Sequence, residues 1–164
     1  MSALSRNARL ASAVCGLALL TAAQTAPARA QPTIVQGHYE ETMGPGQCNN
    51  MSGTECSHQF TAVPSNETLI VTAVNCRIMT RTKNAQIESV TLAVNTPQQF
   101  PILYLPVTPT GNFTSNAGLT TAYTATATPI SKIYTAGQAP SVLLIQFAPN
   151  NPWFLCTIEG TITP

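Results

Sequence analysis

The chain lacks aspartate altogether, and only 8% of its 164 residues are charged. Without aspartate it has neither an Asp-rich calcium loop nor a Ser-His-Asp triad. It also lacks the Gly-x-Ser-x-Gly motif of many hydrolases, and neither of its two histidines has the sequence context of a catalytic base. These absences argue against calcium-loop proteins and against the common nucleophilic hydrolases.

Basic residues are scarce as well. Once residues 1–30 are set aside as a leader, four lysines and arginines remain against six glutamates, a net charge of −2. Arg77, Arg81 and Lys83 lie close together, a pattern typical of a solvated strand face or a guarded sheet edge. Nucleic-acid-binding proteins need many more basic side chains to neutralise phosphates, so we expect no nucleic-acid partner.

The sequence has no apolar run of the ~20 residues that a membrane-spanning helix needs. Its one extended run, residues 10–23, follows the basic residues Arg6 and Arg9. After this run, Ala28-Arg29-Ala30 places small residues at the −3 and −1 positions of a cleavage site. This arrangement predicts a secretory signal peptide at 1–30, and its style is bacterial.

The signal peptide predicts an exported protein, periplasmic or extracellular. The mature chain, residues 31–164, has the size of one domain and carries no integral membrane segment. Cys15 lies inside the leader with Ser12 three positions before it, where a lipidation signal carries leucine or a similar residue. We therefore expect Cys15 to be discarded with the leader.

The mature chain contains four cysteines, at Cys48, Cys56, Cys76 and Cys156. An even number of cysteines in an exported domain predicts two disulfides, for which three pairings are possible. We favour a Cys48–Cys56 bridge within a loop and a Cys76–Cys156 bridge that joins a middle strand to the last one. The alternative of a Cys56–Cys76 bridge across a hairpin stays open.

Short alternating or apolar runs, each followed by proline, glycine or asparagine, repeat along the mature chain, and no helical pattern occurs there. This is the pattern of an all-β protein. Eight or nine strands in one domain predict two packed sheets, a β-sandwich of jelly-roll or immunoglobulin-like layout. The expected strands cover residues 33–41, 57–63, 68–80, 86–94, 100–107, 120–128, 130–134, 141–147 and 153–162.

Several local features refine this expectation. Glycine and proline at 44–46 are expected to interrupt the chain, and residues 113–119 to form a loop. Residues 64–66 (Pro-Ser-Asn) predict a three-residue hairpin turn in which Asn66 adopts the left-handed conformation. Two prolines make strand 100–107 an edge strand or force it to bend. In the last strand one face is expected to point inward, comprising Phe154, Cys156, Ile158, Gly160 and Ile162.

Residues 60–71 (FTAVPSNETLIV) and 156–160 (CTIEG) resemble segments of a loose group of small exported bacterial β-sandwich proteins. Members of that group carry an early Phe-x-x-Val-Pro strand-turn-strand and a closing Ile/Ser-x-Gly strand. Where they have a turn glycine, this chain has Asn66, which tolerates the same left-handed conformation. The resemblance implies a fold and an exported location, and it implies no activity.

Metal sites are poorly supported by the spacing of the ligands. Cys48, Cys56 and His58 could hold zinc, but the gap between the cysteines exceeds that of structural zinc sites, and export favours disulfides. Electron-transfer copper sites place histidine and methionine shortly after a cysteine near the end of the chain, whereas Cys156 precedes Thr-Ile-Glu-Gly. A weak surface site at His38 and Glu40 remains as an alternative. We expect no metal and no cofactor.

A glycoside hydrolase would need two of the six glutamates in one cleft. Glu40 and Glu41 are adjacent and therefore face opposite sides of a strand, Glu67 lies at a turn, and Glu88 and Glu159 occupy positions expected to be exposed. The sequence brings no pair together. We expect no catalytic residues and therefore no enzymatic activity, with a secreted hydrolase as the remaining enzymatic alternative.

The strongest binding signal is aromatic. Trp153 begins the last strand directly after a loop that contains Asn150 and Asn151, and many β-sandwich domains stack a sugar ring on a tryptophan at such a position. The alternative is that Trp153 caps the core. The sequence therefore predicts a non-enzymatic structural or interaction module at the cell surface or in the periplasm, with a protein partner or self-association. The alternative is a soluble module that binds a carbohydrate or another small ligand.

Overall fold

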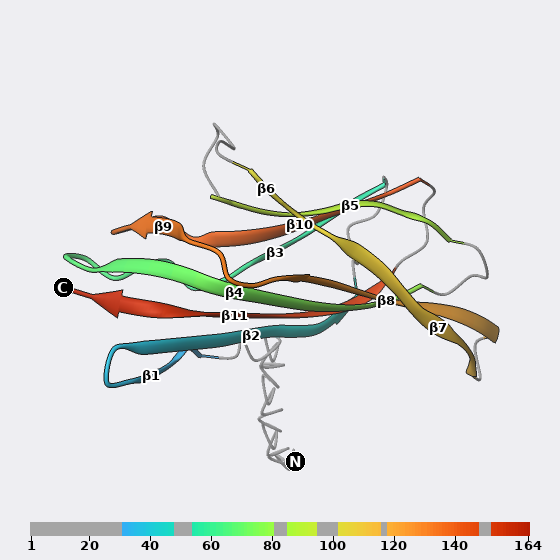
Figure 1. Ribbon diagram of the computed structural model, residues 1–164, viewed down its shortest axis with the longest axis horizontal. Coiled ribbons are helices and arrows are strands. Elements are labelled where there is room, and N and C mark those ends of the chain that lie inside the picture. The colour runs from blue at the N-terminus through green and yellow to red at the C-terminus, as the bar shows by residue number, and fades with distance from the viewer. Residues whose placement is uncertain (1–30, 48–53, 81–84, 95–101, 116–117, 148–151) are drawn as a thin grey trace, which may run out of the picture.

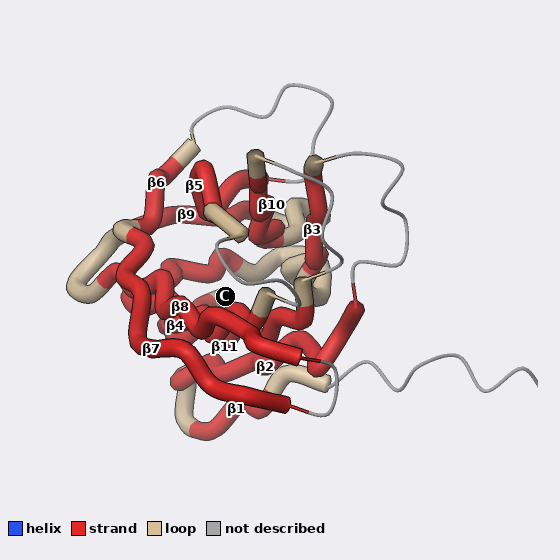
Figure 2. The backbone as a smooth tube through the Cα atoms, turned by 90° about the vertical axis from the view of Figure 1, so that its right-hand side faces the viewer, coloured by secondary structure: helices blue, strands red, loops and turns tan. Residues whose placement is uncertain are grey.

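The computed structural model describes residues 31–47, 54–80, 85–94, 102–115, 118–147 and 152–164. These residues form eleven strands and no helix, so within them there is also no helix that could cross a membrane. The strands make two sheets that pack against each other as a β-sandwich-like pair of layers (Figures 1 and 2). The all-β prediction is confirmed. The predicted signal peptide lies outside the described residues.

The larger sheet has seven antiparallel strands in the order β1-β2-β11-β4-β8-β7, with β9 pairing with β4. The long strand β4 lies at its centre, as predicted for 68–80, and pairs along one side with β11 and along the other with β8 and β9. The strands are β1 (Thr33–Val35), β2 (His38–Gln47), β4 (Thr68–Met79), β7 (Val107–Ser115), β8 (Gly118–Ala127), β9 (Lys132–Thr135) and β11 (Trp153–Thr163).

The smaller sheet has four antiparallel strands in the order β3-β10-β5-β6. Its edge strand β6 precedes Pro106, after which the chain leaves this sheet and enters the larger one as β7 (Figure 1). Strand 100–107 was predicted to be an edge strand or to bend. Its described part does both, since β6 is an edge strand and the chain passes from β6 to β7 at Pro106. The strands are β3 (Glu55–Gln59), β5 (Ile87–Val94), β6 (Leu103–Leu105) and β10 (Pro140–Gln146).

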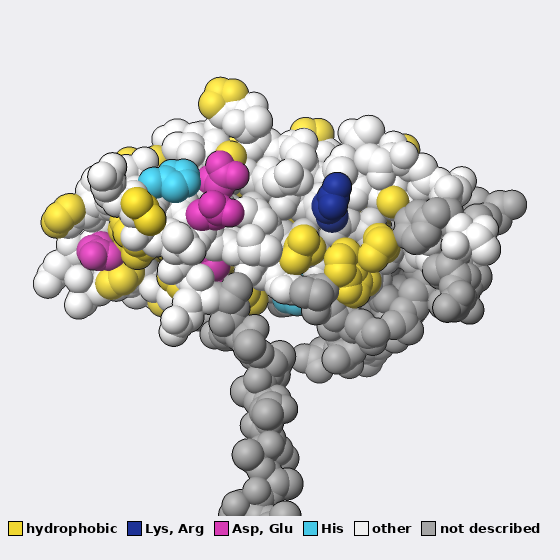
Figure 3. Space-filling model, turned by 90° about the horizontal axis from the view of Figure 1, so that it is seen from below, with side chains coloured by type: hydrophobic (Ala, Val, Ile, Leu, Met, Phe, Trp, Pro, Cys, Tyr) yellow, Lys and Arg dark blue, Asp and Glu magenta, His cyan; other side chains and the backbone are white. Residues whose placement is uncertain are grey.

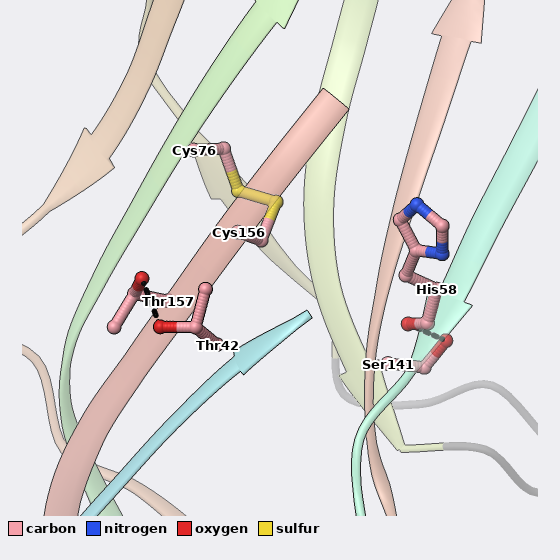
Figure 4. The surroundings of a disulfide bond; sticks show 6 residues. All are labelled: Thr42, His58, Cys76, Ser141, Cys156 and Thr157. Carbon is pink, nitrogen blue, oxygen red and sulfur yellow. Dashed lines mark hydrogen bonds between the residues drawn. A yellow bond between two sulfur atoms is a disulfide. The ribbon is translucent and has the colours of Figure 1, made fainter. Parts of the chain in front are cut away.

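The core lies between the two sheets and is built from the inward face of each strand. Strand β11 alternates as predicted, and all five residues expected to face inward are buried. Cys76 and Cys156 are directly opposite each other on β4 and β11, fully buried and joined by a disulfide (Figure 4). The described residues thus contain this one disulfide rather than two. Cys48 lies outside them, so the Cys48–Cys56 bridge stays a prediction.

The prediction of one strand over 33–41 was wrong, because a two-residue turn splits this segment into β1 and β2. Gln36 and Gly37 both have positive φ, 51° and 81°, and Val35 pairs with His38. Two successive left-handed residues make the turn that matches the twist of a hairpin. Together with the pairing of residues 107–115, this hairpin raises the strand count to eleven, where eight or nine were expected.

The glycines and proline at 44–46 do not interrupt the chain as predicted, since they lie within β2 (His38–Gln47). The pairing with β11 passes from Met43–Cys156 to Gly46–Phe154, which leaves two residues of β2 opposite Leu155. This is a β-bulge. Gly44 has a φ of 114° there, and a Cβ on it would lie 2.8 Å from the carbonyl oxygen of Phe154. Only glycine lets the two strands approach so closely.

The turn at 64–66 forms, but it connects two sheets and is not the predicted hairpin. Asn66 has a φ of 68°, as predicted, and the N–H of Glu67 donates to the carbonyl of Pro64. However, β3 belongs to the smaller sheet and β4 to the larger one. The prediction that residues 113–119 form a loop was wrong. The described residues of this segment belong to β7 and β8, which pair with each other.

Candidate functional site

Trp153 lies on the outer face of the larger sheet, at the start of β11. Phe154 points into the core and is fully buried, so Trp153 and Leu155 point to the opposite side, where both are half-buried. The register places Met79 of β4 beside Trp153 and Arg77 beside Leu155. Arg77 and Trp153 are therefore diagonal neighbours on one face of the sheet, with about 7–8 Å between their positions on the two strands. Trp153 therefore lies on the outer side of the larger sheet and not between the two sheets.

These side chains line a shallow groove of about 330 Å³ across β11, β4, β8 and β7. Its floor is largely apolar, with threonine hydroxyls on the β7 and β8 side. Figure 3, which views this sheet from outside, shows a basic side chain beside a group of hydrophobic ones. The groove, called the Trp153 groove below, is lined by Arg77, Ile78, Met79, Thr110, Ala122, Tyr123, Thr124, Trp153 and Leu155.

Arg77 keeps its positive charge available in this groove. Its side chain is exposed, and no carboxylate among the described residues forms an ion pair with it. The acidic side chains on the same face, Glu40 and Glu159, are four residues further along the strands, which separates them from Arg77 by roughly 13 Å in the strand direction alone. This distance exceeds the Debye length of ~8 Å at physiological salt. The two carboxylates therefore offset the positive charge of Arg77 only weakly.

Glu40 and Glu159 are themselves a pair that sequence reasoning missed. The register of β2 and β11 places them directly opposite each other, both exposed, with His38 opposite Thr161 in the adjacent pair. Like charges at such positions repel each other. No group of three or more histidine, cysteine or acidic side chains in the described part of the chain is arranged to hold a metal ion.

Glu41 faces the other way and is buried, as the alternation of β2 requires. Its carboxylate accepts hydrogen bonds from the Tyr39 hydroxyl, from the Thr61 N–H at 3.0 and 3.1 Å, and from the Thr61 hydroxyl at 2.8 Å. Burial, the hydrogen bond and the charge of Glu41 all raise the pKa of Tyr39 above its usual value. This network joins β2 to the segment that follows β3. It leaves the carboxylate enclosed and saturated with donors, which suits a structural role.

His58 of β3 also faces the core. Its ring lies 4.0 Å from that of Phe154, and its Nε2 is buried with no hydrogen-bond partner among the described residues. Its backbone carbonyl accepts a hydrogen bond from Ser141 (Figure 4). Burial lowers the pKa of His58 below its ordinary value of 6.5, because the apolar surroundings disfavour the imidazolium. This environment suits a neutral ring that packs between the sheets.

We expect the protein to lose stability as the pH falls below ~6.5, the pKa of an unfolded histidine. Below that pH the unfolded chain binds a proton at His58 that the folded chain resists, so protonation favours unfolding. Urea unfolding at pH 7.5 and 5.0 measures this loss. His58→Gln should reduce the difference between the two pH values, and His38→Gln, at an exposed position, should leave it unchanged. An equal pH dependence in all three proteins would contradict the prediction.

A second hollow, of about 260 Å³, lies in the smaller sheet. Thr91 of β5 is among the residues that line it, and its hydroxyl is buried and has no hydrogen-bond partner in the described parts of the chain. Because that oxygen is shielded from solvent, a ligand in the hollow cannot reach it without a rearrangement. The Trp153 groove is therefore the stronger candidate site.

The structure thus brings Trp153, predicted from the sequence, together with Arg77, whose sequence context is typical of a solvated strand face or a guarded sheet edge. Asn150 and Asn151, the other predicted ligand contacts, lie outside the described residues. Arg77 precedes Trp153 by 76 positions, and no local pattern relates them. Comparison with known proteins adds no further assignment: no family model, no curated protein and no solved structure matches the chain.

Proposed function

We propose that the protein is an exported, non-enzymatic interaction module that binds its ligand through the Trp153 groove. The observation that carries the proposal is the half-buried tryptophan on an outer sheet face, beside an arginine that has no acidic partner among the residues the structure describes. A half-buried aromatic in a groove with a few polar groups is typical of a binding site. Export is supported by the leader pattern at 1–30 and by the Cys76–Cys156 disulfide.

The absence of enzymatic activity is part of the proposal and rests on the carboxylates and imidazoles. Glu41 is enclosed in hydrogen bonds, and Glu40 and Glu159 lie opposite each other on an exposed sheet face. His58 is packed against a core phenylalanine. None of these groups borders the Trp153 groove, so a ligand bound there would meet no acid–base pair.

The layout also supports placing the protein among jelly-roll or immunoglobulin-like sandwiches. From β2 to β5 each strand lies in the other sheet from the one before, and β10 and β11 do the same. Connections that cross between two antiparallel sheets are typical of these folds.

We expect Trp153→Ala to abolish ligand binding and to leave the fold intact, since the side chain lies outside the core. The measurement is a glycan array probed with the labelled mature protein and with the variant, alongside urea unfolding of both. Tyr104→Ala is the matched control, because Tyr104 is an aromatic residue 69% exposed in the other sheet. Array binding that survives Trp153→Ala would contradict the proposed site.

A second function, as a subunit of a surface assembly, is favoured by the sheet edge at β1. Ile34 and Val35 are 47% and 59% exposed there, and an edge strand offers unpaired backbone groups to another strand. Light scattering after gel filtration separates the two functions. A monomer supports the binding module, whereas a large or ladder-like assembly supports the subunit and its edge pairing.

A further inference from the structure

We infer that the ligand of the Trp153 groove is a saccharide that carries a carboxylate, with a sugar ring on Trp153 and the carboxylate on Arg77. This inference rests on the proposed function and names the ligand class of the same site. It is carried by the diagonal placement of an aromatic and a cationic side chain on one face.

The apolar part of the groove matches the C–H face of a sugar ring. Trp153, Leu155 and Met79 are all half-buried, so each keeps part of its side chain within reach of a ligand. A ring that stacks on tryptophan gains apolar contact without losing the hydration of its outward hydroxyls. On the opposite wall, Thr110 and Thr124 supply hydroxyls that both donate and accept hydrogen bonds.

The positive charge of Arg77 favours a ligand that carries a carboxylate. Arg77 is the lining residue with a formal charge, and it has no acidic partner in the described part of the chain. A guanidinium presents a planar fork of donors that matches the two oxygens of a carboxylate. Glu40 and Glu159 repel anions at the far end of the same face, so the favourable position for a negative charge lies over Arg77.

The position of the groove on a sheet face argues against a peptide. The backbone groups of β4, β8 and β11 are engaged in the ladders of the sheet, so a peptide laid across this face finds no backbone partners. Peptides that recognise sheets add to an edge strand instead. A saccharide needs only side chains, which the groove supplies.

The fluorescence of Trp153 tests the inference directly, because Trp153 is the one tryptophan of the chain. The probes are short oligomers of galacturonate, glucuronate and mannuronate, each as the free acid and as the methyl ester. We expect at least one free acid to shift the emission and its ester to bind roughly tenfold more weakly, the loss of one charge-assisted contact. Arg77→Gln should weaken binding of the acid to about the level of the ester, so that the preference for the acid disappears.

Lys132→Gln is the matched control, since it removes the same charge from β9, outside the groove. It should leave the preference for the acid intact. Equal binding of acid and ester would contradict the inference that Arg77 binds a carboxylate, but not the proposal of a binding module. Binding of a triglutamate peptide, with no binding of any uronate, would contradict the inference that the ligand is a saccharide. If no uronate binds and the glycan array is also negative, both the inference and the carbohydrate form of the proposed function fail.

Discussion

Gly160→Ala should destabilise the protein by at least about 3 kcal/mol and prevent stable folding in many conditions. A Cβ at this position would lie 2.2 Å from the carbonyl oxygen of Ile70 and 3.0 Å from the Cα of Val71. Both atoms belong to the backbone of β4, the central strand, and cannot rotate away as a side chain could. The methyl group would therefore force β11 and β4 apart where they pair.

Urea unfolding followed by circular dichroism measures the loss, with Gly137→Ala as the matched control. Gly137 has a φ of 79°, and a Cβ there would meet nothing within 4 Å. Its substitution adds backbone strain without overlap and should cost only ~1 kcal/mol. If the two variants unfold at the same urea concentration, the close approach at Gly160 is not what requires glycine.

The double substitution Cys76→Ala/Cys156→Ala should lower the free energy of unfolding by about 4.5 kcal/mol. The disulfide joins residues 80 positions apart, and in the chain-entropy model a closed loop of this size restricts the unfolded chain by about that amount. The bond lies in the core between β4 and β11, so its loss also removes packed sulfur atoms from between the sheets.

The matched control for the disulfide is Thr42→Ala/Thr157→Ala. These hydroxyls make a cross-strand hydrogen bond of 2.8 Å on the part-buried outer side of the same sheet (Figure 4). Their removal should cost less than ~1 kcal/mol, the range of a cross-strand pair. Urea unfolding of the oxidised proteins measures both losses, and a double alanine variant as stable as the wild type would contradict the prediction.

The sequence predicted secondary structure well where the pattern is local. The alternation of β11 and the apolar length of β4 identified the last and the central strand, because side-chain direction follows the period of two. Prediction failed where a turn depends on conformations that the residue types do not demand. Gln36 adopts a positive φ within a hairpin turn, and nothing in a glutamine indicates this.

In the candidate site, too, the sequence predicted the residue with a local signal and missed those that depend on strand pairing. Trp153 was predicted because a tryptophan at a loop–strand junction is a recognisable local signal. Arg77 was not, because its role depends on the register of β4 against β11. The Glu40–Glu159 pair was missed for the same reason, since β2 and β11 come from opposite ends of the described part of the chain.

The sequence by itself determined the all-β class, the inward face of the last strand and the cysteines available for a disulfide. Each follows from the spacing and type of nearby residues. Only the tertiary structure decided which residues share a surface, because strand order and register join segments that are far apart in the chain. The Trp153 groove therefore exists only in the folded sheet, where four strands place an aromatic ring, a guanidinium and two threonines side by side.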